Sequence, residues 1–376
     1  MSALKILHVF STFAPGGAQV RTLELMNHLG NDFEHWICSM DGVTTAAARI
    51  ASGVSYHLLP PLPRGTLPAI QMAPAMFRQV APDLLVTYNW GAMDVAMAAA
   101  LHRPCPFLHT EDGFGADEAQ RLKLRRVLTR RIVLKAAYGV AVPSRTLERI
   151  ALERYRVPPR KVLYLPNGVD VSTFAPRSNA AAREAFQLPP HSLVVGSVGH
   201  LRAEKDFGNL IRAFARLPHE NARLLLVGDG PCRDDLAALA RQLGCAERVC
   251  FAGLLREPAL AYDAMDIFAL SSATEQMPVA LLEAMSSGLP AVCTNVGDCA
   301  EMLDRSEPPF IVPPAQPGHL AAALETLLAD AGLRRTTGEH NRDRCLHRFS
   351  KDLMIEDYRQ TYLRAGGRTG ERVSEA

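Results

Sequence analysis

The 376-residue sequence has no long apolar run, no large excess of either charge and no signal-peptide pattern in its first residues. No stretch approaches the roughly 18 apolar residues that a membrane-spanning helix needs, and MSALKILHVF lacks the apolar core and cleavage site of a signal peptide. With 41 Lys and Arg against 39 Asp and Glu, the net charge is +2, so no nucleic-acid footprint is indicated. We therefore expect a cytoplasmic protein with no nucleic-acid partner, in which any basic function comes from a local cluster.

Two common site motifs are also missing. The eight cysteines include no CxxC pair, and several have apolar neighbours, as Cys250 and Cys293 do. This usage is typical of buried, reduced thiols rather than of disulfides or a metal site. The dinucleotide fingerprint GxGxxG is absent as well, because the glycines at 228 and 230 are followed by Arg233 at the third position.

The sequence alternates between short strand-like runs and longer helical stretches, and this pattern occurs once in each half of the chain. Helical stretches of the first half lie near 18–29, 69–80, 117–136 and 145–154. Before and after a loop-like segment, Val169–Ala180, the runs that predict strands are Leu4–Phe10, Trp36–Met40, Leu84–Tyr88 and Gly139–Val142, then Leu193–Val198, Arg223–Val227, Arg248–Phe251, Ile267–Leu270 and Pro290–Thr294. Such alternation with short loops predicts parallel sheets covered by helices on both faces.

The fold class is therefore α/β, with two doubly wound, Rossmann-like domains facing across a cleft that is the natural ligand site. We expect domains at 1–170 and 185–348. A last amphipathic helix at 351–364 could pack on either of them.

The stretch TEQMPVALLEAMSSGLP, residues 274–290, places two carboxylates around a helix start. Pro278 suits the first helical turn and Gly288 suits the end, so Glu275 lies in the preceding loop and Glu283 lies inside the helix. Exposed N–H groups and the helix dipole favour an anion at such a start. The stretch is a candidate site for a charged, hydroxyl-rich ligand. The alternative is a capping glutamate followed by a solvated one.

In each half of the chain, the loop after the first predicted strand is a further candidate site. Gly16-Gly17 stands directly before a helix, where bare amides could approach a phosphate or a sugar, although a plain turn also explains the pair. Arg202 and Lys205 follow the first strand of the second half and would suit a diphosphate at the carboxyl end of a parallel sheet. Their alternative is solvated loop charge.

In the first half, PFLHTEDGFG places His109 after a strand, with Glu111 and Asp112 close behind. At the carboxyl end of a strand, facing the cleft, a histidine is a candidate for catalysis. A structural histidine is the competing interpretation.

The segment RLKLRRVLTRRIVLK, residues 121–135, carries seven cations and no acid, interleaved with large apolar residues. It predicts a basic amphipathic helix that lies on anionic lipid headgroups. A solvated basic face is the competing interpretation.

These segments together resemble the retaining glycosyltransferases of family 4, which have the GT-B fold. The resemblance extends over nearly the whole chain and is most specific in the Glu-x7-Glu signature of residues 275–283. The other segments that carry it are Gly16-Gly17, VPSRTLERI (142–150), LPNGVDVSTFAP (165–176), VGHLRAEKD, LLLVGDGP (224–231), FAGLL (251–255) and SSATEQMPVALLEAMSSGLPAVCTNVGDCAEML (271–303).

The resemblance implies a role for each candidate. Glu275 would face the donor sugar, Glu283 would bind the ribose hydroxyls, and Lys205 with Arg202 would neutralise the leaving diphosphate. The catalytic set is then Glu275, His109 and Lys205. The donor-binding set is Gly16, Gly17, Arg202, Lys205, Gly228, Met277, Pro278, Val279, Ala280, Leu281 and Glu283. The last helix would cross back onto the first domain. The chain departs from the family at His200, where arginine is frequent, and at Gln276, where glycine is usual.

The function implied is retaining transfer of a hexosyl unit from a UDP- or GDP-sugar to a glycan or lipid-linked acceptor in polysaccharide or exopolysaccharide biosynthesis. No DxD sequence occurs, so no metal and no cofactor are expected. The expected location is the cytoplasm, with contact to the inner face of the membrane through 121–135. Two alternatives stay open: a nucleotide-sugar epimerase of similar shape, which needs no acceptor, and a non-catalytic sugar-binding relative.

Overall fold

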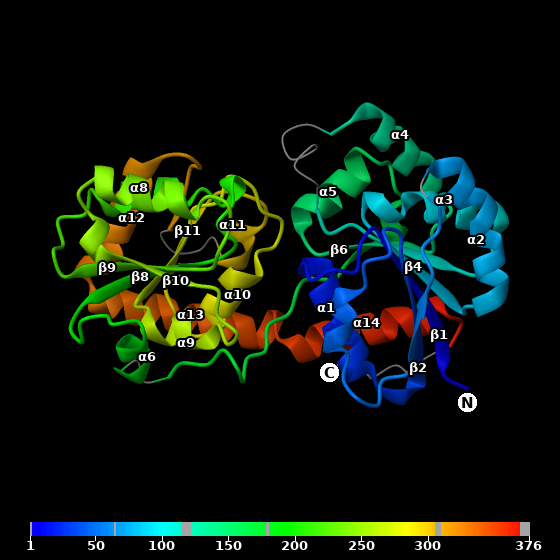
Figure 1. Cartoon of the computed structure of the whole chain (residues 1–376), viewed down its shortest axis with the longest axis horizontal. Coiled ribbons are helices and arrows are strands. Elements are labelled where there is room, and N and C mark those ends of the chain that lie inside the picture. The colour runs from blue at the N-terminus through cyan, green and yellow to red at the C-terminus, as the bar shows by residue number, and fades with distance from the viewer. Residues whose placement is uncertain (1, 64, 114–121, 178–179, 305–309, 369–376) are drawn as a thin grey trace. The chain divides into compact units, whose positions relative to one another are not determined.

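The computed structural model describes residues 2–63, 65–113, 122–177, 180–304 and 310–368 (Figure 1). The chain divides into two compact units. Unit 1 is Met1–Pro166 together with Met354–Ala376, and unit 2 is Asn167–Leu353.

Unit 1 is built on a seven-stranded parallel sheet of order β3-β2-β1-β4-β5-β6-β7. The strand order reverses between β1 and β4, and open α/β sheets bind ligands beyond the carboxyl ends of strands at such a point. Its strands are β1 (Leu4–Phe10), β2 (Phe33–Ser39), β3 (Tyr56–Leu59), β4 (Leu84–Tyr88), β5 (Phe107–Thr110), β6 (Gly139–Val142) and β7 (Val162–Tyr164). Its helices are α1 (Gly17–Leu29), α2 (Thr66–Val80), α3 (Met93–His102), α4 (Leu124–Val133), α5 (Arg145–Glu153) and most of α14 (Lys351–Ala365).

The last helix, α14, completes the core of unit 1. Met354, Tyr358 and Tyr362 are buried in the same apolar cluster as residues of β1 and α1. On the rim, Arg359 donates to the carbonyl of Leu29 at 3.0 Å. A helix more than 180 residues downstream of the last strand, β7, thus supplies part of the unit's apolar core.

Unit 2 repeats the design with a six-stranded parallel sheet of order β10-β9-β8-β11-β12-β13. Its strands are β8 (Leu193–Val198), β9 (Ala222–Val227), β10 (Val249–Gly253), β11 (Ile267–Leu270), β12 (Ala291–Thr294) and β13 (Ile311–Val312). Its helices are α6 (Ala180–Ala185), α7 (Phe207–Phe214), α8 (Arg233–Gln242), α9 (Ala259–Ala264), α10 (Val279–Ser286), α11 (Cys299–Met302), α12 (Pro317–Ala329) and α13 (Ala331–Arg348).

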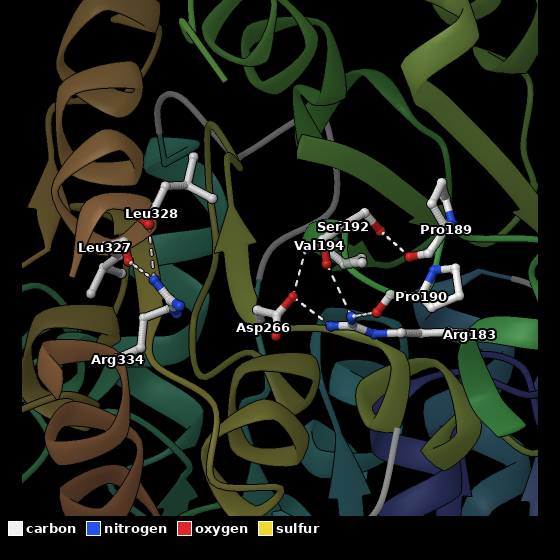
Figure 2. A network of polar contacts seen from close by, with 9 residues as sticks. All are labelled: Arg183, Pro189, Pro190, Ser192, Val194, Asp266, Leu327, Leu328 and Arg334. Atoms are coloured by element: carbon white, nitrogen blue, oxygen red, sulfur yellow. Dashed lines mark hydrogen bonds and ion pairs between the residues drawn. The ribbon is translucent and has the colours of Figure 1, made fainter. Parts of the chain in front are cut away.

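A polar network fixes the amino ends of the central strands of this sheet (Figure 2). The guanidinium of Arg183 in α6 donates to Asp266 Oδ2 at 2.7 Å and to the carbonyl of Ser192 at 3.0 Å. The same carboxylate oxygen accepts the backbone N–H of Val194 at 2.7 Å. Charge-assisted bonds of this kind are stronger than neutral ones. The network thus joins the starts of β8 and β11, at the edge opposite the carboxyl ends of these strands.

The prediction of an α/β fold with two doubly wound units is confirmed, and five predicted strands have the observed bounds. Strands β3, β5, β7 and β13 were absent from the predicted ranges, although a strand ahead of His109 was assumed. Each has two to four residues, and β3 is largely exposed at the sheet edge, so none carries the apolar run on which the prediction relied. The helix expected at 117–136 is α4, ten residues long, and the start of the expected range lies outside the described residues.

All eight cysteines are free, and five of them are buried. Among the described residues, no helix combines the length and apolarity needed to cross a bilayer.

Candidate functional site

The carboxyl edge of the unit 2 sheet brings Lys205 and Glu275 together. Lys205 ends a short 3₁₀ turn (Ala203–Lys205) after β8, and Glu275 lies in the loop after β11. Lys205 Nζ is 2.6 Å from Glu275 Oε1, and the hydroxyl of Ser272 donates to the same oxygen at 2.7 Å. Their side chains are 31% and 11% exposed, so the pair is accessible to a ligand from one side. Because both contacts go to Oε1, neither uses Oε2.

The two loops that carry this pair are joined to each other. The backbone N–H of Ala273 donates to the carbonyl of Glu204 at 2.8 Å, and the hydroxyl of Ser271 donates to the carbonyl of Lys205 at 3.0 Å. Behind them, Thr294 at the end of β12 donates to the carbonyl of Ser272 at 2.6 Å. The relative position of ammonium and carboxylate is therefore fixed by three strand ends rather than by a flexible loop.

The shape of the Glu275 loop depends on a glycine that the sequence reasoning did not single out. Gly297 has φ +53°, and a Cβ at this position would lie 2.5 Å from the carbonyl oxygens of Glu275 and Gln276. The next residue, Asp298, donates its N–H to the carbonyl of Gln276 at 2.8 Å. Gln276 is absent from the described residues with positive φ, so this loop keeps its shape without the glycine usual at that place.

Helix α10 begins beside this loop. Pro278 is its N-cap residue, and Val279, the first helical residue, is 42% exposed. Asn167 fixes the segment before α10, because its side-chain amide donates to the carbonyl of Met277 at 3.0 Å. Of the amides predicted to bind the donor, that of Leu281 donates to the carbonyl of Pro278 at 3.1 Å, within the helix itself. At this helix start Val279 is exposed, whereas Ala280 is half-buried against the apolar core.

Glu283 lies in α10 and is paired with Tyr262, which the sequence reasoning did not identify. The hydroxyl of Tyr262, in α9, donates to Glu283 Oε2 at 2.6 Å. Burial raises the pKa of Glu283 from 4.5 to about 7, although the Tyr262 hydrogen bond acts to lower it. Burial and the nearby carboxylate raise the pKa of Tyr262 well above its usual value. The carboxyl of Glu283 therefore changes charge near neutral pH.

Two other predicted donor residues have clearer structural roles. Gly228 follows β9 with φ +132°, and a Cβ there would lie 1.9 Å from the carbonyl oxygen of Gly199. Only glycine allows the loops after β8 and β9 to approach so closely. Arg202 precedes the 3₁₀ turn and is exposed, so the structure places Lys205, and not Arg202, against Glu275.

In unit 1, the glycine pair lies at the start of α1, after β1. Gly16 is the N-cap residue with extended backbone, and Gly17 is the first helical residue; both are exposed. A Cβ on Gly17 would meet no atom within 4 Å, and one on Gly16 would meet first the end of the Gln19 side chain. The fold itself does not require either glycine, so bare amides are open to a ligand here.

The prediction that His109 follows its strand is wrong, because the residue lies inside β5. It is fully buried, with Nδ1 at 2.9 Å from Thr87 Oγ1 and Nε2 at 3.6 Å from Glu111 Oε2. Glu111 in turn receives two bonds from Arg130, at 2.8 and 3.1 Å. Burial acts to raise the pKa of Glu111, but the Arg130 charge and His109 together hold it below its usual value. This enclosed network favours the structural interpretation of His109.

Comparison with known proteins identifies the family of this chain. The family model described as Glycosyltransferase Family 4 matches residues 15–173, and the one described as Glycosyl transferases group 1 matches residues 178–344. The lipopolysaccharide core biosynthesis glycosyltransferase LpsE of Rhizobium meliloti (strain 1021) is 33% identical over 181 residues, which are 48% of this chain and 53% of that protein. The D-inositol 3-phosphate glycosyltransferase of Mycobacterium sp. (strain KMS) is 29% identical over 276 residues, 69% of this chain and 62% of that protein.

The chain thus spans less than two thirds of the length of these two relatives. Among solved structures, Anabaena Alr3699/HepE in complex with UDP and glucose has a TM-score of 0.79 at 19% identity. The match covers 95% of this chain and 99% of that chain, and it shows a shared fold. The chain belongs to the family 4, group 1 glycosyltransferases, which have the GT-B fold.

Proposed function

We propose that the protein transfers a hexosyl unit from a nucleotide-diphosphate sugar to a glycan or lipid-linked acceptor in polysaccharide biosynthesis. The observation that carries this proposal is the Lys205–Glu275 pair, held at the carboxyl edge of the unit 2 sheet beside the start of α10. A UDP-sugar is the first donor to test, because HepE was solved with UDP and glucose, and GDP-sugars are the second.

The roles proposed for these residues follow from the charges that develop on the donor during transfer. Breaking a sugar–phosphate bond leaves negative charge on the departing diphosphate and positive charge on the anomeric carbon. In this proposal Lys205 and the start of α10 stabilise the diphosphate, which is the kind of term that dominates electrostatic catalysis. Glu275 accepts hydrogen bonds from the sugar, and Glu283 accepts them from the ribose.

Retention of configuration is part of the proposal. A double displacement needs a second carboxylate about 5 Å from the nucleophile. Glu275 instead has Lys205 and Ser272 as its neighbours. We therefore assign the acceptor's proton to the departing diphosphate oxygen, on the same face of the sugar. No metal or cofactor takes part, because a fixed ammonium and a helix start supply the positive charge.

The acceptor side of the proposal places the protein at the cytoplasmic face of a membrane. LpsE, to which this chain is similar, is named for lipopolysaccharide core biosynthesis, and a lipid-linked acceptor of that kind is presented at a membrane surface. Helix α4 is the segment proposed to make the contact.

The test is turnover of the Lys205→Ala variant. UDP- and GDP-sugars are first screened by thermal shift, and transfer and nucleotide release are then measured with the donor that stabilises the protein. We expect kcat to fall on the order of a hundred- to a thousand-fold, while the free energy of unfolding changes by less than about 1 kcal/mol.

Arg177→Ala is the matched control, because Arg177 also faces a carboxylate, Asp263, with side chains 47% and 11% exposed. Near-normal turnover of the Lys205 variant would remove this residue from the mechanism. Conversion of the donor without an acceptor would indicate an epimerase instead, and donor binding without nucleotide release would indicate a non-catalytic relative.

A further inference from the structure

Glu283 is a half-buried carboxyl that lacks a charged partner. Among the described residues, no cation forms an ion pair with it, and its one hydrogen bond is the bond that Tyr262 donates to Oε2 at 2.6 Å. The second oxygen, Oε1, therefore has no partner within the described part of the chain. Polar atoms in such surroundings are nearly always hydrogen-bonded. Oε1 is thus available to a group of a bound molecule.

Tyr262, which donates the bond to Oε2, is itself fixed. The residue is 1% exposed, and its ring packs edge-on against Phe174, with the ring centres 5.6 Å apart, and against Phe268 at 6.0 Å. Its hydroxyl also lies 3.3 Å from the carbonyl of Ala280, in the first turn of α10. Because a ring enclosed in a close-packed core keeps one orientation on average, the hydroxyl points in a constant direction.

The helix that carries Glu283 is held at both ends. Before its start, the side chain of Asn167 donates to the carbonyl of Met277 at 3.0 Å. At its last residue, the hydroxyl of Ser286 donates to the carbonyl of Phe174 at 2.6 Å. The freedom that remains is rotation about the side-chain bonds of Glu283, and the hydrogen bond at Oε2 restricts this rotation. Ordering a side chain before a ligand arrives removes an entropic cost from binding.

The ligand group that suits Oε1 is a hydroxyl. A carboxylate accepts hydrogen bonds and donates none, so Glu283 matches the hydroxyls of a ribose. Dinucleotide-binding α/β folds place an acidic residue on the ribose 2′-hydroxyl for the same reason. A 2′-deoxyribose lacks this hydroxyl and would leave the carboxylate without that bond.

We propose that Tyr262 is a positioning residue for the donor nucleotide. By holding Oε2 of Glu283, it directs Oε1 toward the ribose and makes unit 2 selective for ribonucleotides over 2′-deoxyribonucleotides. The inference rests on the proposed function, because it takes the ribose role of Glu283 from it. A hydrogen bond to an ionised group changes affinity roughly ten- to a hundredfold, and this is the selectivity that we expect.

The test measures the dissociation constants of UDP and 2′-deoxy-UDP by isothermal titration calorimetry, with the full chain at pH 8. GDP and 2′-deoxy-GDP replace them if GDP forms the tighter complex. In the parent, the 2′-deoxynucleotide should bind roughly ten- to a hundredfold more weakly. Tyr262→Phe keeps the packed ring and removes the hydroxyl. This ratio of constants should then fall at least about fivefold, while binding of the 2′-deoxynucleotide stays nearly the same.

Ser192→Ala is the matched control for loss of a buried hydroxyl in unit 2. The hydroxyl of Ser192 donates to the carbonyl of Pro189 at 2.7 Å, at the opposite edge of the sheet, and Ser192 is 3% exposed. We expect this variant to keep the ratio of the parent. If Ser192→Ala lowered the ratio as much as Tyr262→Phe does, general loosening of unit 2 would be the cause and the inference would be wrong.

Glu283→Ala tests whether Tyr262 acts through this carboxyl. Tyr262→Phe should lower the ratio in the parent but not in the Glu283→Ala background, where no carboxyl remains to be positioned. A further fall in that background would overturn the proposal.

A repeat at pH 9 separates position from charge. Burial raises the pKa of Glu283, and the Tyr262 hydrogen bond acts to lower it, so Tyr262→Phe also favours the protonated carboxyl. We expect the low ratio of Tyr262→Phe to persist at pH 9. If the parent ratio returned there, Tyr262 would set only the charge of Glu283, and the positioning role would be wrong.

The outcomes also distinguish this inference from the proposed function. If the parent binds ribonucleotide and 2′-deoxynucleotide equally, the inference fails and the Lys205 test of transfer is unaffected. If the parent binds neither UDP nor GDP, both the inference and the proposed donor are wrong.

Discussion

The replacement of Glu283 by glutamine tests whether a buried carboxyl at the candidate donor site titrates near neutral pH. Glutamine keeps the shape of the side chain and an oxygen that accepts the Tyr262 hydroxyl, 2.6 Å away in the parent. It removes the negative charge that burial disfavours. Any pH-dependent difference between the two proteins then reports the ionisation of this one carboxyl.

The size and sign of the effect follow from the two pKa values. The pKa is about 7 in the folded chain and 4.5 in its ordinary environment, so folding favours the protonated form. Between these values the folded state binds more protons than the unfolded state, and stability falls as the pH rises, levelling off above about 7. Between about pH 5 and about pH 8 the parent should lose roughly 2–3 kcal/mol of unfolding free energy from this group. Glu283→Gln should not show that loss.

The measurement is urea unfolding followed by circular dichroism at both pH values and constant ionic strength. The only two tryptophans, Trp36 and Trp90, lie in unit 1, so their fluorescence would not report on unit 2. Glu325→Gln, on the exposed side of α12, is the control for loss of a carboxylate. If parent and Glu283→Gln lose the same stability between the two pH values, the carboxyl is ionised throughout and the reasoning about its burial fails.

Three other changes separate structural from functional groups. Gly228→Ala should cost about 3 kcal/mol of unfolding free energy, because a Cβ there meets a backbone oxygen, whereas Gly244→Ala, also at positive φ but in open space, should cost about 1 kcal/mol. Glu111→Gln should cost about 3 kcal/mol, since Arg130 is left charged and buried, and Trp90 fluorescence would follow it. Glu148→Gln, at a side chain that is 26% exposed, should cost less than about 1 kcal/mol. Equal losses of unfolding free energy in the two glycine variants would exclude the backbone contact as the cause. Equal losses in the two carboxylate variants would exclude burial as the cause. Transfer activity should persist in EDTA, and its loss on chelation with recovery on added metal would contradict the proposed role of Lys205.

Much of the fold was accessible from the sequence because its signals are local. Apolar runs such as Leu84–Tyr88 and Leu193–Val198 predicted strands with the observed bounds, since both faces of these strands are covered. Strand β13, with two residues, has no such run and exists because β12 pairs with it. The contribution of α14 to the core of unit 1 also lies beyond local pattern, because its amphipathic face fits either unit.

The candidate site was predicted only in part, because contacts between distant residues leave no local signal in the sequence. Lys205 and Glu275 are 70 positions apart, and only the carboxyl ends of neighbouring parallel strands bring them together; that edge is predictable once the strands are. Tyr262 is not, because a tyrosine in a short helix carries no sign of the carboxyl that it will meet. His109 was misplaced because β5 continues through His109 to Thr110, which turns the expected loop position into a buried strand position.

The glycines show how the structure separates two meanings that the sequence leaves mixed. Gly228 and Gly297 have positive φ and no room for a Cβ, so their presence is explained by the fold whether or not a ligand binds. Gly17 has an ordinary φ and open space around it, so the fold would accept alanine. A glycine that the backbone does not require lowers helix stability by roughly 0.5–1 kcal/mol relative to alanine. The exposed start of α1 therefore lowers stability without a structural reason, as expected if a phosphate or sugar approaches the bare amide, which is the role that we propose for it.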